Sequence, residues 1–249
     1  ADERYTLRRL SSTRELCIGR EAHEMKRAVI YGGLNYDMGT DAMARATSEY
    51  RDTDLAVSRT VSRGSLSLAE GMLPDENIYS ETYHEAVNIA EMLRSCGVEP
   101  DLKTDDSGVE ESFKALSGRQ FELLHIATHG FYMPGHTEYQ TSEELLSPMM
   151  RSGLMLSRKK TLSADDREDG LLLAREIADM DLSAVDLVVL SACQTALGDL
   201  SGNEIFGLQR GLKQAGVGTI VMTLWQIDSQ MAQYMMTEFY NNLTVGMER

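Results

Sequence analysis

Two residues of this sequence, His129 and Cys193, have the chemistry of a reactive pair. His129 follows the apolar run LLHIAT, and Cys193 follows the apolar run DLVVLSA. Both runs are typical of buried strands, and the carboxyl ends of parallel strands meet at one edge of a sheet, where ligands bind. A thiol attacks as the thiolate, which a neighbouring imidazole can stabilise or generate by taking the proton. The pattern therefore indicates a cysteine–histidine dyad.

Gly130 directly follows the histidine, so no side chain blocks the approach of a reacting carbonyl to its backbone N–H. Together with the N–H of Cys193 it could form a two-donor oxyanion hole, which contributes roughly 10²–10³ in rate per donor. An alternative needs no catalysis. A single buried cysteine usually packs as a small hydrophobic side chain, and a histidine at a strand end is usually structural. Spacing alone leaves both interpretations open.

Composition narrows the function classes. The chain has 249 residues, 42% of them hydrophobic, which is enough for one large α/β domain or two small ones. Its formal net charge of −15 argues against direct binding of nucleic acid. Three cysteines without a CxxC pair, Cys17, Cys96 and Cys193, suggest neither disulfides nor a zinc site and fit a reducing cytoplasm.

Neither a membrane span nor a signal peptide is expected. No stretch approaches the ~18 to 20 apolar residues that a spanning helix needs, and the first ten residues lack the apolar core of a signal peptide. We therefore expect a cytoplasmic protein with no membrane partner. No GxGxxG or GxxxxGK[ST] string follows a predicted strand, which disfavours a nucleotide-binding protein.

Strand patterns alternate with helix patterns along the chain. The spacing of Ala86, Ile89, Ala90 and Leu93 predicts a helix that starts at Ser80 as N-cap and stops at Gly97. Further strands are predicted at 26–33, 98–102, 121–130, 185–193 and 219–225, further helices at 107–118, 171–183, 202–218 and 229–243, a strand or hairpin at 147–157, and a surface excursion at 40–71. Such alternation predicts a mostly parallel sheet between helices.

The strings HIATHGFY and DLVVLSACQTALGDLSGNEIFGLQRGLKQAGVGTIVMTLWQIDS resemble the CHAT family of caspase-like cysteine peptidases. AVIYGGLNY resembles the first strand of that family and LPDENIYSETYHEAVNIAEML its first helix. SPMMRSGLMLS and DGLLLAREIADMDL resemble its middle segments, so the likeness spans most of residues 26–243. The His-Gly and Ser-Ala-Cys motifs also occur in the order of the family, at the predicted strand ends.

The resemblance implies a caspase-like three-layer α/β/α sandwich with a mostly parallel central sheet. It implies a cysteine endopeptidase in which Cys193 is the nucleophile, His129 the catalytic histidine, and the N–H groups of Gly130 and Cys193 the oxyanion hole. Neither a metal nor another cofactor is needed. The substrate is a protein or peptide, and a regulatory partner or an attached sensor module releases activity. Residues 26–249 form the peptidase domain, and 1–25 are an N-terminal extension, the tail of an upstream helical-repeat segment.

The resemblance also assigns residues to substrate binding. It places Asn35 and Tyr36 near the substrate cleft, although a turn role explains both nearly as well. It also places Trp225, Gln226 and Asp228 at the pocket for the residue before the scissile bond, where a carboxylate would favour Lys or Arg. For Trp225 a place in the core is the alternative. Asp228 has a second interpretation as the N-cap of the helix that follows.

Other interpretations stay open at this point. His125 precedes His129 by four positions, but no third metal ligand is suitably spaced, so a packed core histidine is predicted. The chain could also be a catalytically silent scaffold that binds a peptide or a signalling partner. A third possibility is a small-molecule hydrolase or acyltransferase that uses the same dyad.

Overall fold

A five-stranded sheet forms the centre of the computed structural model, which describes residues 24–50, 76–132, 148–159, 168–191, 206–223 and 229–245. Its strand order is β2-β1-β3-β7-β8, and every neighbouring pair is parallel. The strands are β1 (Arg27–Leu34), β2 (Glu99–Asp105), β3 (Leu123–Ile126), β7 (Leu187–Leu190) and β8 (Thr219–Met222). The predicted parallel sheet is confirmed.

The three middle strands are buried on both faces. All four residues of β3 and of β7 are buried, as are seven of the eight residues of β1. A strand covered on both sides needs a continuous apolar run instead of an alternating one, and LLHI and LVVL are such runs. The one polar side chain among these two strands, His125, therefore requires partners inside the core.

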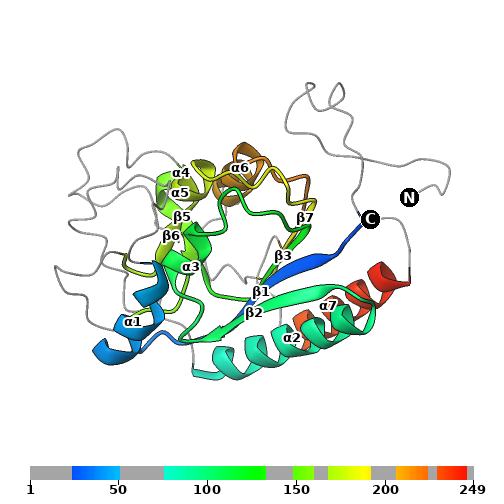
Figure 1. Ribbon diagram of the computed structural model, residues 1–249, viewed down its shortest axis with the longest axis horizontal. Coiled ribbons are helices and arrows are strands. Elements are labelled where there is room, and N and C mark those ends of the chain that lie inside the picture. The colour runs from blue at the N-terminus through cyan, green and yellow to red at the C-terminus, as the bar shows by residue number, and fades with distance from the viewer. Residues whose placement is uncertain are drawn as a thin grey trace.

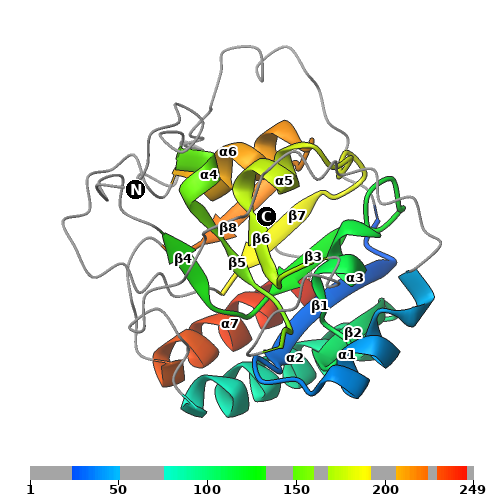
Figure 2. The ribbon, with the colours of Figure 1, turned by 90° about the vertical axis from the view of Figure 1, so that its left-hand side faces the viewer.

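Two long helices cover one face of the sheet. The helices α2 (Glu76–Ser95) and α7 (Ser229–Thr244) run side by side along it (Figures 1 and 2). Ile89 and Leu93 of α2 and Met236 of α7 pack against Ile30 and Val189 of the sheet. Burying a side chain of this kind contributes roughly 1.5–3 kcal/mol, which explains why these amphipathic helices lie flat on the strands.

The opposite face is covered by shorter helices, which Figure 2 shows above the strands. Phe113, Ile177 and Leu212 from three of these helices share one apolar cluster with Leu124 and Val188 of the sheet. The helices on this side are α3 (Glu110–Lys114), α4 (Pro148–Arg151), α5 (Ala174–Ala178) and α6 (Phe206–Gln214). The fold is therefore a three-layer α/β/α sandwich, as the sequence predicted.

A second sheet of three antiparallel strands lies against these helices. It has the order β4-β5-β6 and consists of β4 (Gly130–Tyr132), β5 (Ser152–Met155) and β6 (Leu171–Leu173). Two predictions need correction here. The strand predicted at 121–130 is two strands in different sheets, and the helix predicted at 171–183 begins with β6. The strand or hairpin predicted at 147–157 contains the strand β5, which follows the short helix α4. The run Leu171–Leu173 pairs with β5 because all three side chains are buried and no polar face is available to a helix.

Two helix boundaries test the sequence signals. Helix α2 begins at Glu76, so Ser80 lies inside the helix and is not its N-cap, contrary to the prediction. Gly97 does end it, with a φ of +82° that favours glycine. The predicted surface excursion at 40–71 contains α1 (Thr40–Ala46) and the short helix η2 (Ser48–Tyr50), and the rest of it lies outside the described residues.

In the part of the chain that the structure describes, no helix is both long and apolar enough to cross a membrane.

Candidate active site

The pairing register between β3 and β7 bears directly on the predicted dyad. In the ladder between β3 and β7, Leu123 lies opposite Leu187 and Ile126 opposite Leu190, so paired residues keep one constant offset in sequence number. The amide of Ser191 extends this ladder by donating to the carbonyl of Ile126 at 2.9 Å. His129 and Cys193 have the same offset in the sequence as the paired residues of the ladder. Cys193 itself lies outside the described residues.

His129 lies at the junction between the two sheets. Strand β3 of the large sheet ends at Ile126, and β4 of the small sheet begins at Gly130. The histidine is 4% exposed, and its carbonyl oxygen accepts a hydrogen bond of 2.8 Å from the amide of Met155 at the end of β5. The small sheet therefore fixes the histidine from its C-terminal side, at the carboxyl edge of the large sheet.

Two hydroxyl groups fix the other side of this junction. Thr128 donates from Oγ1 to the carbonyl of Met155, and the Tyr36 hydroxyl lies 2.8 Å from the same Oγ1. Because the single proton of Thr128 is already donated, the Tyr36 hydroxyl must be the donor between the two. The Tyr36 oxygen is also hydrogen-bonded to the backbone of His129. Burial raises the pKa of the Tyr36 phenol, so this donor keeps its proton at neutral pH.

The hydrogen-bonding pattern of β4 determines the direction of the Gly130 N–H. Gly130 lies opposite Leu154 in the antiparallel ladder, and the hydrogen bond from Met155 to His129 flanks that pair. This makes Gly130 and Leu154 a non-hydrogen-bonded pair, in which the N–H of each residue is directed away from the other strand. The N–H of Gly130 therefore points away from β5.

Asn35 organises the turn that follows β1. Its side-chain amide donates to Asp106 Oδ1 at 2.8 Å, and its side-chain oxygen accepts the amide of Asp37 at 3.0 Å. Its backbone carbonyl accepts the amide of Arg158 at 2.9 Å. These contacts support the turn role that the sequence left open for Asn35 beside a role in the cleft.

The remaining predicted site residues cannot be placed. Trp225, Gln226 and Asp228, like Cys193, lie outside the described residues. Their assignments to the substrate pocket and to the nucleophile position stay predictions.

The CHAT-domain model matches residues 3–249, almost the whole chain. The chain belongs to the CHAT family. The CHAT domain suggests a caspase-like protease fold, which agrees with the three-layer sandwich described above. No curated protein matches the sequence. One solved structure similar to this CHAT chain is a flavodoxin of Streptococcus pneumonia TIGR4, 9% identical, with a TM-score of 0.33 over 90% of this chain and 100% of the flavodoxin. A similarity this weak carries no argument.

His125 of the CHAT fold is a core histidine, as predicted. It is fully buried under α2 and α7, with Nδ1 3.1 Å from the Tyr240 hydroxyl and Nε2 3.1 Å from Glu85 Oε1. Burial, and next the charge of Glu85, raise the pKa of Tyr240 well above its ordinary value, so its hydroxyl keeps its proton at neutral pH. The contact between Nε2 of His125 and Glu85 is not aligned as a hydrogen bond.

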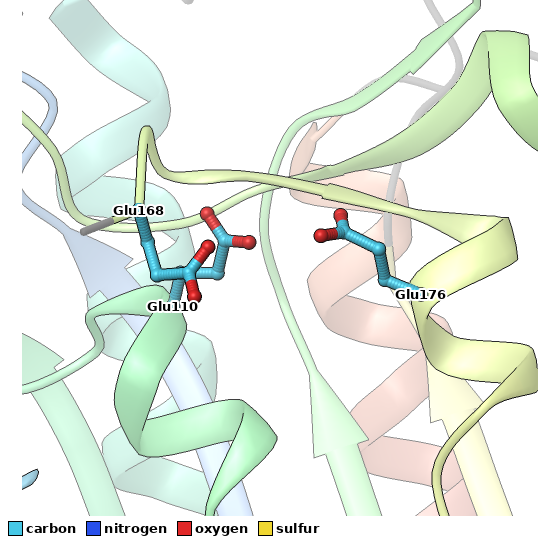
Figure 3. Close-up of side chains that lie close together, drawn as sticks. All are labelled: Glu110, Glu168 and Glu176. Atoms are coloured by element: carbon cyan, nitrogen blue, oxygen red, sulfur yellow. The ribbon is translucent and has the colours of Figure 1, made fainter. Parts of the chain in front are cut away.

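A cluster of three buried glutamates has the oxygen atoms that a metal site would need. Oxygen atoms of Glu110, Glu168 and Glu176 lie within 4.8 Å of one another, and Figure 3 shows the three carboxylates turned toward one another. The ammonium of Lys114 lies among them, at 2.8 Å from Glu110, 2.7 Å from Glu168 and 3.0 Å from Glu176. The cation that these carboxylates face is therefore a side chain, and the group is an ion-pair network.

This network also holds the backbone of the small sheet. Burial alone lowers the pKa of Lys114, but the charges of Glu110, Glu176 and Glu168 outweigh it and raise that pKa. Glu110 accepts the amide of Gly170 and Glu176 the amide of Leu173, both at 2.9 Å. Strand β6 is thereby fixed beside β5, whose last residue contacts His129. The spacing of Glu110 and Lys114 is visible in the sequence, but the two other glutamates come from distant segments.

Proposed function

We propose that this CHAT chain is a cysteine endopeptidase that cleaves protein or peptide substrates through Cys193 and His129. The observation that carries the proposal is the sequence offset of the dyad, which equals the offset between paired residues of β3 and β7. The carboxyl ends of neighbouring parallel strands meet at one edge of the sheet. His129 and Cys193 each follow the last paired residue of their strand, Ile126 and Leu190, by three positions, so the proposal assigns both to this edge.

The proposed reaction follows from the chemistry of these groups. The sulfur of Cys193 attacks the scissile carbonyl carbon, the C–N bond breaks, and His129 gives its proton to the leaving amine. His129 then removes a proton from water, and the water oxygen attacks the acyl carbon. The C–S bond breaks, the acid leaves, and His129 returns the proton to the sulfur. The N–H of Gly130, directed away from β5, stabilises the oxyanion during both steps.

Regulation and preference belong to the same proposal. From the CHAT resemblance we infer that a partner or an attached sensor module releases activity. A carboxylate at Asp228 would favour Lys or Arg before the scissile bond. Both inferences can fail without affecting the dyad.

An electrophilic peptide probe tests the dyad most directly. An acyloxymethyl ketone with Lys at the position before the electrophile is expected to alkylate the chain at Cys193, located by mass spectrometry of the labelled peptide. Cys193→Ala is expected to abolish labelling. The matched control is Cys96→Ala, because Cys96 is exposed beyond the end of α2 and has no role in the mechanism.

Two results would contradict the proposal. Labelling that survives Cys193→Ala would reject the nucleophile. A wild-type chain that binds the probe reversibly without forming a covalent bond would favour the catalytically silent scaffold. A probe that reacts equally well with Leu in place of Lys would reject only the inference about Asp228.

A further inference from the structure

We propose that Tyr36 is a positioning residue that fixes His129 through a closed ring of hydrogen bonds, and that the proposed cysteine chemistry depends on this ring. The inference rests on the proposed function, because it concerns how the histidine of the dyad is held. The sequence analysis predicts a place for Tyr36 near the substrate cleft or in a turn. Its contacts indicate a further role at the backbone of the histidine.

The ring joins three segments that lie far apart in the sequence. The backbone N–H of His129 donates to the Tyr36 oxygen, the Tyr36 hydroxyl donates to Thr128 Oγ1, and Thr128 donates to the carbonyl of Met155. The amide of Met155 then donates to the carbonyl of His129 at 2.8 Å, which closes the ring. Both polar groups of the His129 backbone are therefore used, one by a side chain and one by β5.

The location of the ring explains why the fold needs it. Residues 127–129 lie between the last ladder pair of β3 and the first residue of β4, where the chain leaves one sheet and enters the other. The carbonyl of Tyr31 in β1 accepts the amide of Ala127, and the amide of Met155 in β5 donates to the carbonyl of His129, so one backbone hydrogen bond from each sheet reaches this segment. The hydroxyls of Tyr36 and Thr128 supply the hydrogen bonds that a ladder supplies elsewhere.

The directions of these hydrogen bonds predict how Tyr36→Phe affects the backbone of His129. Tyr36→Phe removes both the acceptor for the His129 N–H and the donor to Thr128, while the carbonyl of His129 stays bound to Met155. Of the two backbone hydrogen bonds of His129 described above, one then remains. A displacement of about 1 Å at a reacting group can cost 10²-fold in rate, so we expect kcat to fall about 10- to 100-fold. Because no substrate contact is removed, KM should stay within about twofold.

The experiment uses the alkylation rate of Cys193 by iodoacetamide between pH 5 and 9, read by mass spectrometry of the Cys193 peptide, together with peptide turnover. The wild-type chain is expected to react at acidic pH, because the imidazolium of His129 stabilises the thiolate. Tyr36→Phe is expected to slow this acidic reaction about 10-fold. Tyr31→Phe is the matched control, since Tyr31 is also buried, lies in β1 and donates to or accepts from Ser112 without contacting His129.

A second pair of variants covers the case in which Tyr36→Phe does not fold. Thr128→Val keeps the shape of the side chain but removes the hydroxyl, and it should reproduce the loss. Thr128→Ser restores the hydroxyl and should recover most of the rate. A purely structural role would alter the unfolding midpoint but not the pH profile of Cys193 in the folded protein.

The outcomes separate the inference from the proposed function. If His129→Ala leaves the alkylation profile of Cys193 unchanged, the dyad itself is wrong. If His129→Ala removes the acidic reaction but Tyr36→Phe and Thr128→Val retain it together with wild-type kcat, the dyad stands and the positioning role is overturned. An equal loss of the acidic alkylation rate in Tyr36→Phe and in Tyr31→Phe would also overturn the positioning role.

Discussion

His125 and His129 lie four residues apart, yet the protein holds them in opposite ways. The ring of His125 is fixed by side chains, the Tyr240 hydroxyl and the Glu85 carboxylate, while its backbone belongs to the ladder of the large sheet. The backbone of His129 is fixed by Tyr36 and by β5, at the place where the ladder has ended. A histidine that serves packing is held by its ring, and one proposed for chemistry is held by its main chain.

The largest expected effect lies on the catalytic side of this comparison. His129→Ala should lower the rate of peptide cleavage about 10²- to 10⁴-fold, because the general acid and base is removed. The measurement is kcat/KM on a peptide amide. His84→Ala is the matched control, because His84 is an exposed residue of α2. Equal rates for His129→Ala and the wild type would remove the distinction between the two histidines.

On the structural side, His125→Ala should destabilise the fold by about 3–5 kcal/mol, because a cavity replaces a fully buried ring and the Tyr240 hydroxyl loses its partner. Urea denaturation measures this loss. Folded His125→Ala protein should still cleave peptide at the wild-type rate per molecule. The double variant His125→Leu with Glu85→Leu should regain most of the stability, and a double variant as unstable as the single one would contradict the paired role.

Removing only the hydroxyl partner of His125 should cost less. Tyr240→Phe is expected to lower the free energy of unfolding by about 1–3 kcal/mol, because Nδ1 of the buried ring loses its hydrogen-bond partner. The ring of Tyr240 keeps its edge-to-face contact with His125 in this variant. A change below about 0.5 kcal/mol in urea denaturation would show that the hydroxyl does not hold the ring.

The same tyrosine makes the fold sensitive to alkaline pH. The pKa of Tyr240 is raised in the folded state. The stability that Tyr240 contributes is therefore fully present below the unfolded pKa of about 10 and is lost as the pH rises from there toward the folded pKa. Over this pH range the free energy of unfolding falls by about 1.4 kcal/mol per pH unit for each such group. Tyr240→Phe should make the fall in stability between pH 10 and 11 less steep by about this amount. An unchanged slope would contradict the assignment.

The smallest effect is expected from an exposed ion pair. Arg175 and Asp179 approach within 3.2 Å on the surface of α5, with side chains 42% and 30% exposed. Arg175→Ala should change the free energy of unfolding by about 0.5 kcal/mol or less, because solvent screens such pairs. The stability loss of this variant is the reference for the buried pair of His125 and Glu85. If Arg175→Ala lowered the free energy of unfolding as much as His125→Ala does, burial would not explain the difference between the exposed and the buried pair.

The sequence predicted the parts of the fold that depend on local pattern. Apolar runs identified β1, β3 and β7, and helical spacing identified α2, because a buried strand and an amphipathic helix each leave a short-range signature. The break between β3 and β4 was missed, since FELLHIATHG is apolar through most of its length and the pairing with β5 decides where the chain changes sheet. His129 was found by residue type and position, without knowledge of that break.

The contacts that hold the candidate site could not be predicted in this way. Tyr36 and Thr128 are 92 residues apart, and His125 and Tyr240 are 115 residues apart. No periodicity links such pairs, because they meet only after the strands and helices have packed. The sequence identified Tyr36 as a residue near the cleft but gave no sign that its hydroxyl contacts the main chain of the histidine.

The strand order has a consequence for how this protein is made. Strand β3 pairs on one side with β1, which precedes it, and on the other with β7, which is synthesised much later. At a usual synthesis rate of about 5–20 residues per second, the second edge of β3 waits roughly 3–13 s for its partner on a translating ribosome. During that interval an apolar strand has unpaired backbone groups that other chains could join. Nascent chains of this protein should therefore depend on ribosome-associated chaperones until β7 has emerged.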